Sequence, residues 1–127
     1  MSASNYLENV ILASLLDSST WYVALHTADP TETGATGEVS GGSYARKDVV
    51  ASNGTEWTTP SGGATENINA IVFVQATANW GTITHCSIWD SVSGGNCLLY
   101  GALNAAKVIN NGDIFEFAAG DAHITCD

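Results

Sequence analysis

The segment TITHCSIWDSVSGGNCLLYGAL, residues 82–103, decides the fold of this chain. Its two ends, 82–89 and 96–103, are rich in the apolar and β-branched residues that favour strands, and two consecutive glycines lie in the turn between them. This pattern is typical of a β-hairpin with a long loop. Similar extended segments and glycine-containing turns fill residues 68–125, with almost no catalytic-looking residues among them. The far half of the chain therefore predicts short, paired strands.

Extended segments recur along the rest of the chain at a spacing of roughly 8–12 residues, which favours a β-sandwich or barrel. The apolar run 68–74 is expected to be a central strand, and Asn111-Gly112 is expected to turn a second hairpin. We predict a mainly β, antiparallel sandwich or barrel with about seven or eight strands. The segments expected to form them are 21–27, 44–51, 68–74, 82–89, 96–103, 105–109, 114–117 and 123–126.

Residues 4–16 predict the one short helix, near the N-terminus. Its first two residues, a serine and an asparagine, can each cap it, and Leu7, Ile11 and Leu15 lie four residues apart on one face. A helix this short must dock on another surface to persist, either the body of the same domain or a neighbouring subunit. No linker or internal repeat divides the chain, so we expect a single β domain over residues 1–127.

Composition excludes several classes of partner. The chain has 127 residues, 45% of them hydrophobic, and a net charge of −10 with only Arg46, Lys47 and Lys107 as cations. Nucleic acid and anionic membranes need clustered cations, so neither is an expected partner. No apolar run approaches the roughly 18 residues of a membrane span. The start of the chain lacks the basic region of a signal peptide, so we expect it to be made in a cytoplasm.

The residues that most often carry chemistry do not form a convincing site. A zinc site usually shows paired ligands, whereas the cysteines and histidines here are scattered: His85, Cys86, Cys97, His123 and Cys126. A bridge between Cys86 and Cys97 across the hairpin stays open as an alternative. Neither metal nor cofactor is predicted.

Two further groups of polar residues, one in the segment 85–90 and one in the loop 28–43, are not predicted to form sites. Ser87, His85 and Asp90 share one segment and are expected to be polar strand residues rather than a catalytic triad, since no Gly-x-Ser-x-Gly elbow is present. Acidic residues in the long loop 28–43 lack EF-hand spacing, so no calcium site is predicted from Asp29, Glu32 and Glu38.

Four tryptophans are many for a chain of this size. Trp21 and Trp89 lie in apolar strand segments, so we expect both in the core. Trp57 and Trp80 lie near turns, and we expect them to be partly exposed and to contact a partner.

Eight short stretches, in the same order over nearly the whole chain, resemble short proteins of tailed bacteriophages that are usually described as tail fibre proteins. The stretches are SNYLEN (4–9), HTADPT (26–31), GGSYAR (41–46), NWGTITH (79–85), GGN (94–96), LYGAL (99–103), NGD (111–113) and FAAG (117–120). The resemblance implies a virion structural protein without enzymatic activity. It also implies apolar residues at the positions of Cys86 and Cys97, which favours buried thiols there over a metal site.

The leading hypothesis from the sequence is a capsid decoration (cement) protein on the outer surface of the phage head. The chain is short for an extended shaft, lacks heptad or collagen-like repeats, and is acidic. We expect a homo-oligomer, such as a trimer, bound to the major capsid protein through the helix and the loop 28–43. The candidate interface residues are Tyr6, Leu7, Val10, Ile11, Asp29, Pro30, Trp57 and Trp80.

The alternative is a tail fibre or tail-tip component that binds other tail proteins and the host cell surface. A third, more distant hypothesis is an enzyme domain such as a cell-wall hydrolase. All three place the finished protein in the virion, after synthesis in the cytoplasm of the bacterial host.

Overall fold

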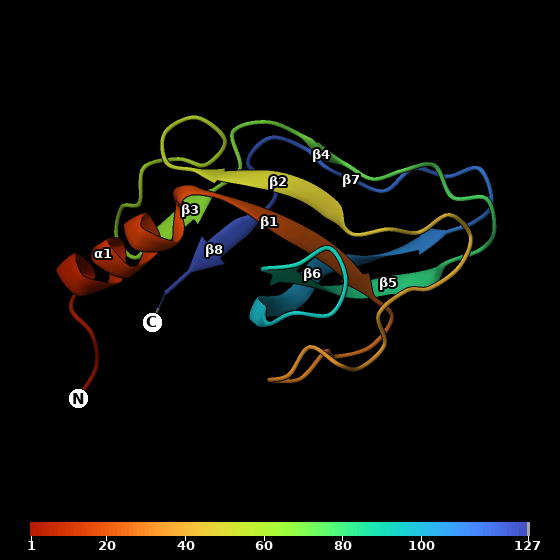
Figure 1. The fold of residues 1–127 in the computed structure, drawn as a ribbon, viewed down its shortest axis with the longest axis horizontal. Coiled ribbons are helices and arrows are strands. Elements are labelled where there is room, and N and C mark those ends of the chain that lie inside the picture. Colours follow the sequence, from red (N-terminus) through yellow and green to blue (C-terminus); the bar gives the residue numbers. More distant parts are fainter. Residues whose placement is uncertain (127) are drawn as a thin grey trace. The chain divides into compact units, whose positions relative to one another are not determined.

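One helix and eight strands make up the secondary structure of residues 1–126, the part of the chain that the computed structural model describes, without the side chain of Ser18 (Figure 1). This confirms the predicted mainly β class with one N-terminal helix. The elements are α1 (Asn5–Leu15), β1 (Asp17–His26), β2 (Lys47–Ser52), β3 (Ala64–Glu66), β4 (Ile71–Val72), β5 (Gly81–Trp89), β6 (Cys97–Ile109), β7 (Glu116–Phe117) and β8 (His123–Thr125).

The strands form three sheets. The largest has four strands in the order β2-β1-β5-β6, and two small sheets pair β3 with β8 and β4 with β7. The β1–β5, β5–β6 and β3–β8 pairs are antiparallel, as predicted. Within residues 1–126 no sheet closes on itself, so the architecture is consistent with the sandwich alternative and not with the barrel.

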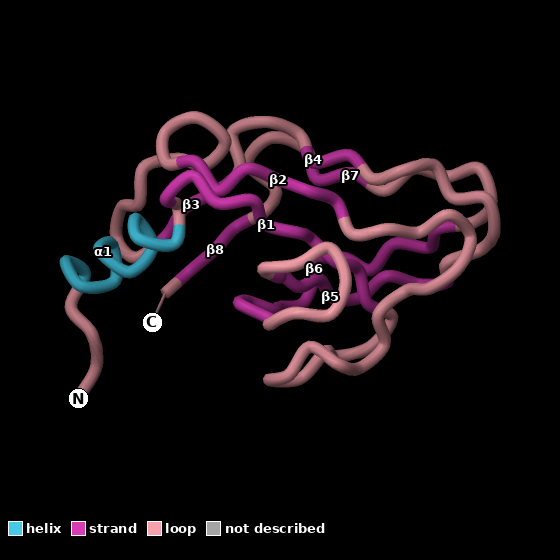
Figure 2. Tube along the Cα trace, viewed as in Figure 1, coloured by secondary structure: helices cyan, strands magenta, loops and turns pink. Residues whose placement is uncertain are grey.

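Contacts within the chain define two compact units, each built from separate segments. The first contains residues 1–20, 49–71 and 116–127, and the second contains residues 21–48 and 72–115. Figure 2 shows that most of the chain between the strands is loop. The expectation of one domain stays a prediction.

The core of the second unit lies around the predicted hairpin strand β5 and its neighbour β1. Tyr22–His26 pair with His85–Trp89, and β1 is buried on both faces from Trp21 to His26 apart from Tyr22. Alternation is clear in the segment 72–74, where Phe73 is buried between two exposed valines. Its backbone N–H donates to the Phe115 carbonyl at 2.9 Å, and the two phenyl rings meet edge to face at 5.7 Å.

The first unit is held together by helix packing and by one buried amide. Leu12 and Leu16 bury the inner face of α1. The buried Asn67 side chain donates to the carbonyls of Asn69 and Ala118 and accepts from the backbone N–H of Ala122, at 2.8–2.9 Å. A buried amide whose donors and acceptor are all used fixes the chain near β3 against the segment before β8.

Three strand predictions are wrong. The segments 96–103 and 105–109, expected as separate strands, form the single strand β6. The run 68–74 is not a central strand, because only β4 is regular there and it pairs with β7 alone. Asn111-Gly112 does make a tight turn, closed by a 2.9 Å hydrogen bond from the Asp113 N–H to the Asn110 carbonyl. It does not make a hairpin, however, because the flanking strands β6 and β7 do not pair with each other. The turn instead bonds to Ala76, through backbone hydrogen bonds of 2.7 and 2.9 Å.

Candidate functional site

Helix α1 exposes an apolar face. Ser4 caps the helix by accepting a 3.3 Å hydrogen bond from the Leu7 N–H, which confirms one of the two predicted caps. The exposed side chains include Tyr6, 79% exposed, and three aliphatic residues that are 39–47% exposed. These four residues, Tyr6, Leu7, Val10 and Ile11, are called the helix face below.

α1 exposes more apolar side chain than an ordinary surface helix and half-buries polar residues beside its core residue Leu12. Ordinary surface helices turn apolar residues inward and polar residues to solvent. Here the polar Glu8 and Asn9 are half-buried, and the Asn9 Oδ1 atom accepts the Gly63 N–H at 2.8 Å. Gly63 has a φ of +74°, a backbone conformation that favours glycine, and a Cβ there would also lie 3.0 Å from the backbone carbonyl oxygen of Cys126. The polar side of the helix is therefore used within the first unit, and the helix face is left to solvent.

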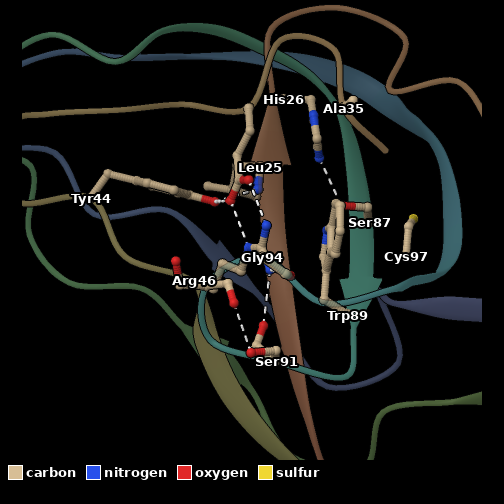
Figure 3. Close-up of polar contacts among 12 residues, drawn as sticks. Leu25, His26, Ala35, Tyr44, Arg46, Ser87, Trp89, Ser91, Gly94 and Cys97 are labelled. Carbon is tan, nitrogen blue, oxygen red and sulfur yellow. Dashed lines mark hydrogen bonds and ion pairs between the residues drawn. The ribbon is translucent and has the colours of Figure 1, made fainter. Parts of the chain in front are cut away.

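The second unit contains a network of polar side chains around Arg46, shown in Figure 3. The guanidinium group donates from Nε and Nη2 to the two carboxylate oxygens of Glu38, both at 2.9 Å. Its Nη1 atom donates to the carbonyls of Ser91 and Gly94 at 2.9 Å, and the group lies 4.0 Å over the Trp89 ring. Four of the five guanidinium N–H donors are thus used. Arg46 joins the long loop to the turn between β5 and β6.

The Glu38 carboxylate accepts hydrogen bonds from both Arg46 and Tyr44 in this network. Burial alone would raise the pKa of its carboxyl group, but the hydrogen bonds and positive charge of Arg46 lower it below its usual value. The Tyr44 hydroxyl also donates to Glu38 at 3.0 Å and accepts from the Leu25 N–H at 3.0 Å. The arrangement stabilises ionised Glu38 and fixes loop 28–43 beside β1.

A second buried chain of hydrogen bonds superficially resembles a serine–histidine catalytic pair. In Figure 3, His26 reaches from β1 to Ser87 on β5, and Nε2 lies 2.7 Å from the Ser87 Oγ atom. The Thr36 carbonyl, 2.8 Å from Nδ1, can only accept, so Nδ1 carries the proton of the neutral ring and Nε2 accepts from the serine hydroxyl. The serine oxygen in turn accepts from the Trp89 Nε1–H at 2.7 Å.

The His26–Ser87 pair is buried and links a loop to the sheet. His26 and Ser87 are 0% and 1% exposed, so no substrate reaches the hydroxyl in this conformation. The position that a carboxylate holds in a catalytic triad, beside Nδ1, is taken by the neutral Thr36 carbonyl, which would not stabilise an imidazolium. The hydrogen bonds attach the loop at Thr36 to the sheet.

The other residues weighed as sites do not converge. His85 bonds to Thr84, and Asp90 accepts from Asn96, so neither joins Ser87. Within residues 1–126, no three histidine, cysteine or acidic side chains gather closely enough to hold a metal ion. The cysteines are free, and Cys86 and Cys97 lie opposite Gly101 and Trp89 rather than each other. Cys86 and Cys97 are half-buried, and burial raises the pKa of the Cys86 thiol to about 11.

Residues 2–125, nearly the whole chain, match the family model described as Podophage GP4 fiber I protein gp80. The chain belongs to this family. Membership agrees with the resemblance seen in the sequence and makes the chain a phage tail fibre-type protein, a component of the virion. The curated proteins include no match to it.

The fibre family fits the tail-fibre alternative better than the leading hypothesis from the sequence. Capsid decoration is not confirmed by the match. Of the helices in the described part of the chain, none is long and apolar enough to cross a membrane.

The predicted interface residues of this fibre-family chain fall into two groups. The helix face and Asp29 are exposed, whereas Pro30, Trp57 and Trp80 are buried. The expected exposure of the two tryptophans is therefore wrong. Trp57 is 1% exposed despite its turn-rich surroundings, and the Trp80 indole, 6% exposed, donates to the Gly42 carbonyl at 3.0 Å. Trp80 also packs edge to face against Tyr44, which lies in a distant segment. The prediction that Trp21 and Trp89 are core residues is confirmed.

The buried imidazole predicts a pH dependence of stability. Burial lowers the pKa of His26 from its usual value of 6.5, although the Thr36 carbonyl and Glu38 act the other way; Arg46 and His85 reinforce the shift. His26 binds a proton more readily in the unfolded chain than in the folded one. The contribution of the neutral imidazole to the free energy of unfolding is therefore fully present above pH 6.5, and it is lost as the pH falls from 6.5 towards the lowered pKa of the folded state. Urea unfolding at about pH 7.5 and 5.5 should show this loss.

Two variants assign the effect to His26. His26→Gln should remove the dependence over this interval, whereas His123→Gln, at an exposed imidazole beside Glu66, should keep it. Equal stability of the unmodified chain at both pH values would contradict the assignment.

Proposed function

We propose that this chain is a non-enzymatic structural subunit of a podophage fibre, attached to another virion protein through the helix face of α1. The match of residues 2–125 to the fibre family carries the proposal. The exposure of the helix face supports the mode of attachment, because a tyrosine and three aliphatic side chains lie open to solvent.

Physical considerations favour the helix face as the attachment surface. Burying apolar area contributes roughly 25 cal/mol per Å², and tyrosine is among the residues most often responsible for interface affinity. The face carries no charged residue, so its desolvation on binding costs little. Helix–groove contacts of this kind are read through anchors spaced three and four residues apart, as Leu7, Val10 and Ile11 are.

The absence of enzymatic activity is supported by the burial of the His26–Ser87 pair. Ser87 already donates to the imidazole and accepts from Trp89, so it would have to leave both contacts to attack a substrate. His26 links Ser87 on β5 to Thr36 in the loop 28–43.

Reconstruction of the intact virion tests the assignment. Density for this fold in the fibres supports the proposal, and regular density over the icosahedral shell would restore capsid decoration and overturn it. Inhibition of phage adsorption by the purified protein would add binding of the host surface to this role. Turnover of a cell-envelope substrate by the same preparation would contradict the non-enzymatic part.

Charge placed on the helix face should prevent assembly. In phage carrying Ile11→Glu, we expect the subunit to be lost from purified particles, measured by quantitative mass spectrometry, because a carboxylate must be desolvated in the contact. Val50→Glu is the matched control, since Val50 is an aliphatic residue of similar exposure on β2. Both purified variants should unfold at nearly the same urea concentration as the unmodified chain. Full incorporation of Ile11→Glu would remove α1 as the attachment site.

A further inference from the structure

Two extended segments of the second unit enclose a groove of about 330 Å³. Residues 45–48 line one wall, and residues 72–74 line the other. The two segments are joined beyond one end of the groove, where the Thr77 N–H donates to the Gly42 carbonyl at 3.0 Å and the hydroxyls of Ser43 and Thr77 lie 2.8 Å apart. The groove is therefore a feature of one compact unit with two extended walls.

The wall at 72–74 has one backbone edge that is not used by its strand partner. The Phe73 N–H donates to the Phe115 carbonyl at 2.9 Å, and neighbouring residues of an antiparallel ladder direct their backbone groups to opposite sides. The N–H and C=O groups of Val72 and Val74 consequently point away from Phe115, to the side on which Thr77 bonds to Gly42. The two valine side chains are 40% and 48% exposed. This wall presents both free backbone groups and apolar surface.

The opposite wall leads into an end strand of the four-stranded sheet. Strand β2 begins at Lys47 and pairs with β1 alone within residues 1–126. The unpaired N–H and C=O groups of an end strand can template a further strand. Two backbone edges thus line one groove, and an extended segment lying between them can pair with both.

The charges of the groove favour an occupant with an acidic side chain. The chain carries −10 overall and has three cations, two of which, Arg46 and Lys47, line the groove. The Arg46 guanidinium group is bound by Glu38 at 2.9 Å. The Lys47 side chain is 41% exposed, and its ammonium lies 3.7 Å from Asp48, too far for a hydrogen bond. Lys47 therefore keeps donors for a carboxylate of the occupant.

Other occupants fit these walls less well. A saccharide would leave the backbone edges largely unpaired, and Phe73, the aromatic residue of the groove, is 3% exposed and offers no ring for stacking. A second copy of the chain would bring a further charge of −10 and be repelled as a whole.

From the two backbone edges, the exposed valines and the exposed lysine, we infer that the groove binds an extended segment of a different virion protein by strand addition. The segment pairs its backbone with residues 45–48 and 72–74, packs aliphatic side chains on Val72 and Val74, and places an acidic side chain beside Lys47. Main-chain hydrogen bonds supply the affinity of such contacts, and alternate side chains supply their specificity. The groove contains no residue of the helix face, so the inference goes beyond the attachment proposed for α1 and does not depend on it.

Synthetic peptides of about ten residues, the upper end of common strand lengths, test the inference. They tile the other structural proteins of the same phage particle and this chain itself, and fluorescence anisotropy measures their binding to the full chain. We expect a peptide from another virion protein, with alternating aliphatic residues and an acidic residue, to bind with a Kd on the order of micromolar. Amide hydrogen exchange should then slow in residues 45–48 and 72–74.

Val74→Glu should raise the Kd of that peptide about tenfold or more, because a carboxylate must be desolvated in the groove. Ile114→Glu is the matched control, since Ile114 is 53% exposed and does not line the groove, and it should bind as the unmodified chain does. Lys47→Glu should weaken binding, whereas Lys107→Glu, the same charge change on β6, should not. Ile11→Glu should also keep full binding, which separates this contact from the helix face.

Urea unfolding of each variant checks that it folds, and the exchange measurement needs no substitution. Absence of binding by every peptide from the other virion proteins, equal Kd values for Val74→Glu and Ile114→Glu, or slowed exchange only outside the groove would each overturn the inference. Strongest binding by a peptide of this chain would make the occupant a second copy and overturn it as well. Binding of host polysaccharide that Val74→Glu abolishes would do the same.

Discussion

Replacing Arg46 with methionine is expected to lower the free energy of unfolding by about 3–4 kcal/mol. The substitution leaves the Glu38 carboxylate partly buried without its cation, and it removes donors from the carbonyls of Ser91 and Gly94. Loss of one partner of a buried pair usually costs about 3–5 kcal/mol, and the quarter of the Glu38 side chain still exposed favours the lower part of that range.

Lys47→Met is the matched control for Arg46→Met. It removes the neighbouring cation, whose side chain is 41% exposed and whose contact with Asp48 is 3.7 Å long, so the loss should stay below about 1 kcal/mol. Urea unfolding followed by tryptophan fluorescence measures both. Adding Glu38→Gln to Arg46→Met should recover part of the loss, because no unpaired charge then remains. Equal effects of the two single substitutions would contradict the structural role given to Arg46.

Trp57→Ala is expected to destabilise the first unit by about 3–5 kcal/mol, the range for deleting a large buried aromatic side chain. Trp57 is 1% exposed, so its removal leaves a cavity that the surrounding residues fill only in part. Chemical unfolding of the purified chain measures the change. The same variant tests the earlier expectation that this residue contacts a partner, because a surface contact would leave stability nearly unchanged.

Tyr6→Ala is the complementary control. Tyr6 is 79% exposed, so truncation should change stability by less than about 0.5 kcal/mol while weakening incorporation into particles. If Trp57→Ala unfolds like the unmodified chain and only impairs incorporation, the burial of Trp57 in the free subunit is wrong. The opposite pattern for Tyr6 would place the helix face in the core.

Much of the fold could be predicted because strand and turn signals are local. Strand β5 and the helix lie within a few residues of their predicted positions, and β6 begins where the second hairpin strand was expected but continues through the predicted strand 105–109. The failures concern pairing. Asn111-Gly112 makes the turn that its residue types demand, but the partner of that turn is Ala76, more than thirty residues away, and no local pattern encodes that choice. The strand β3 was not predicted because three residues are too few to show a clear alternation of apolar and polar side chains.

The exposure of the candidate residues agrees with the prediction on the helix and disagrees with it where burial depends on distant segments. The residues of the helix face are apolar and lie on a helix too short to be stable in isolation, which predicts a docking surface, and they are exposed. Trp57 and Trp80 were judged from nearby turn residues, whereas burial of Trp80 comes from Gly42 and Tyr44. The network of Arg46 was not predicted, because its partners lie up to 48 residues away along the chain.

The enclosure of Arg46 also affects how the particle meets proteases. Trypsin-like enzymes need an accessible lysine or arginine, and the Arg46 side chain is only 7% exposed. The two remaining cations, Lys47 and Lys107, both lie in strands, whose hydrogen-bonded backbone is not free to enter a protease active site. A chain of 127 residues with three basic side chains therefore offers a digestive enzyme very few places to cut while it stays folded.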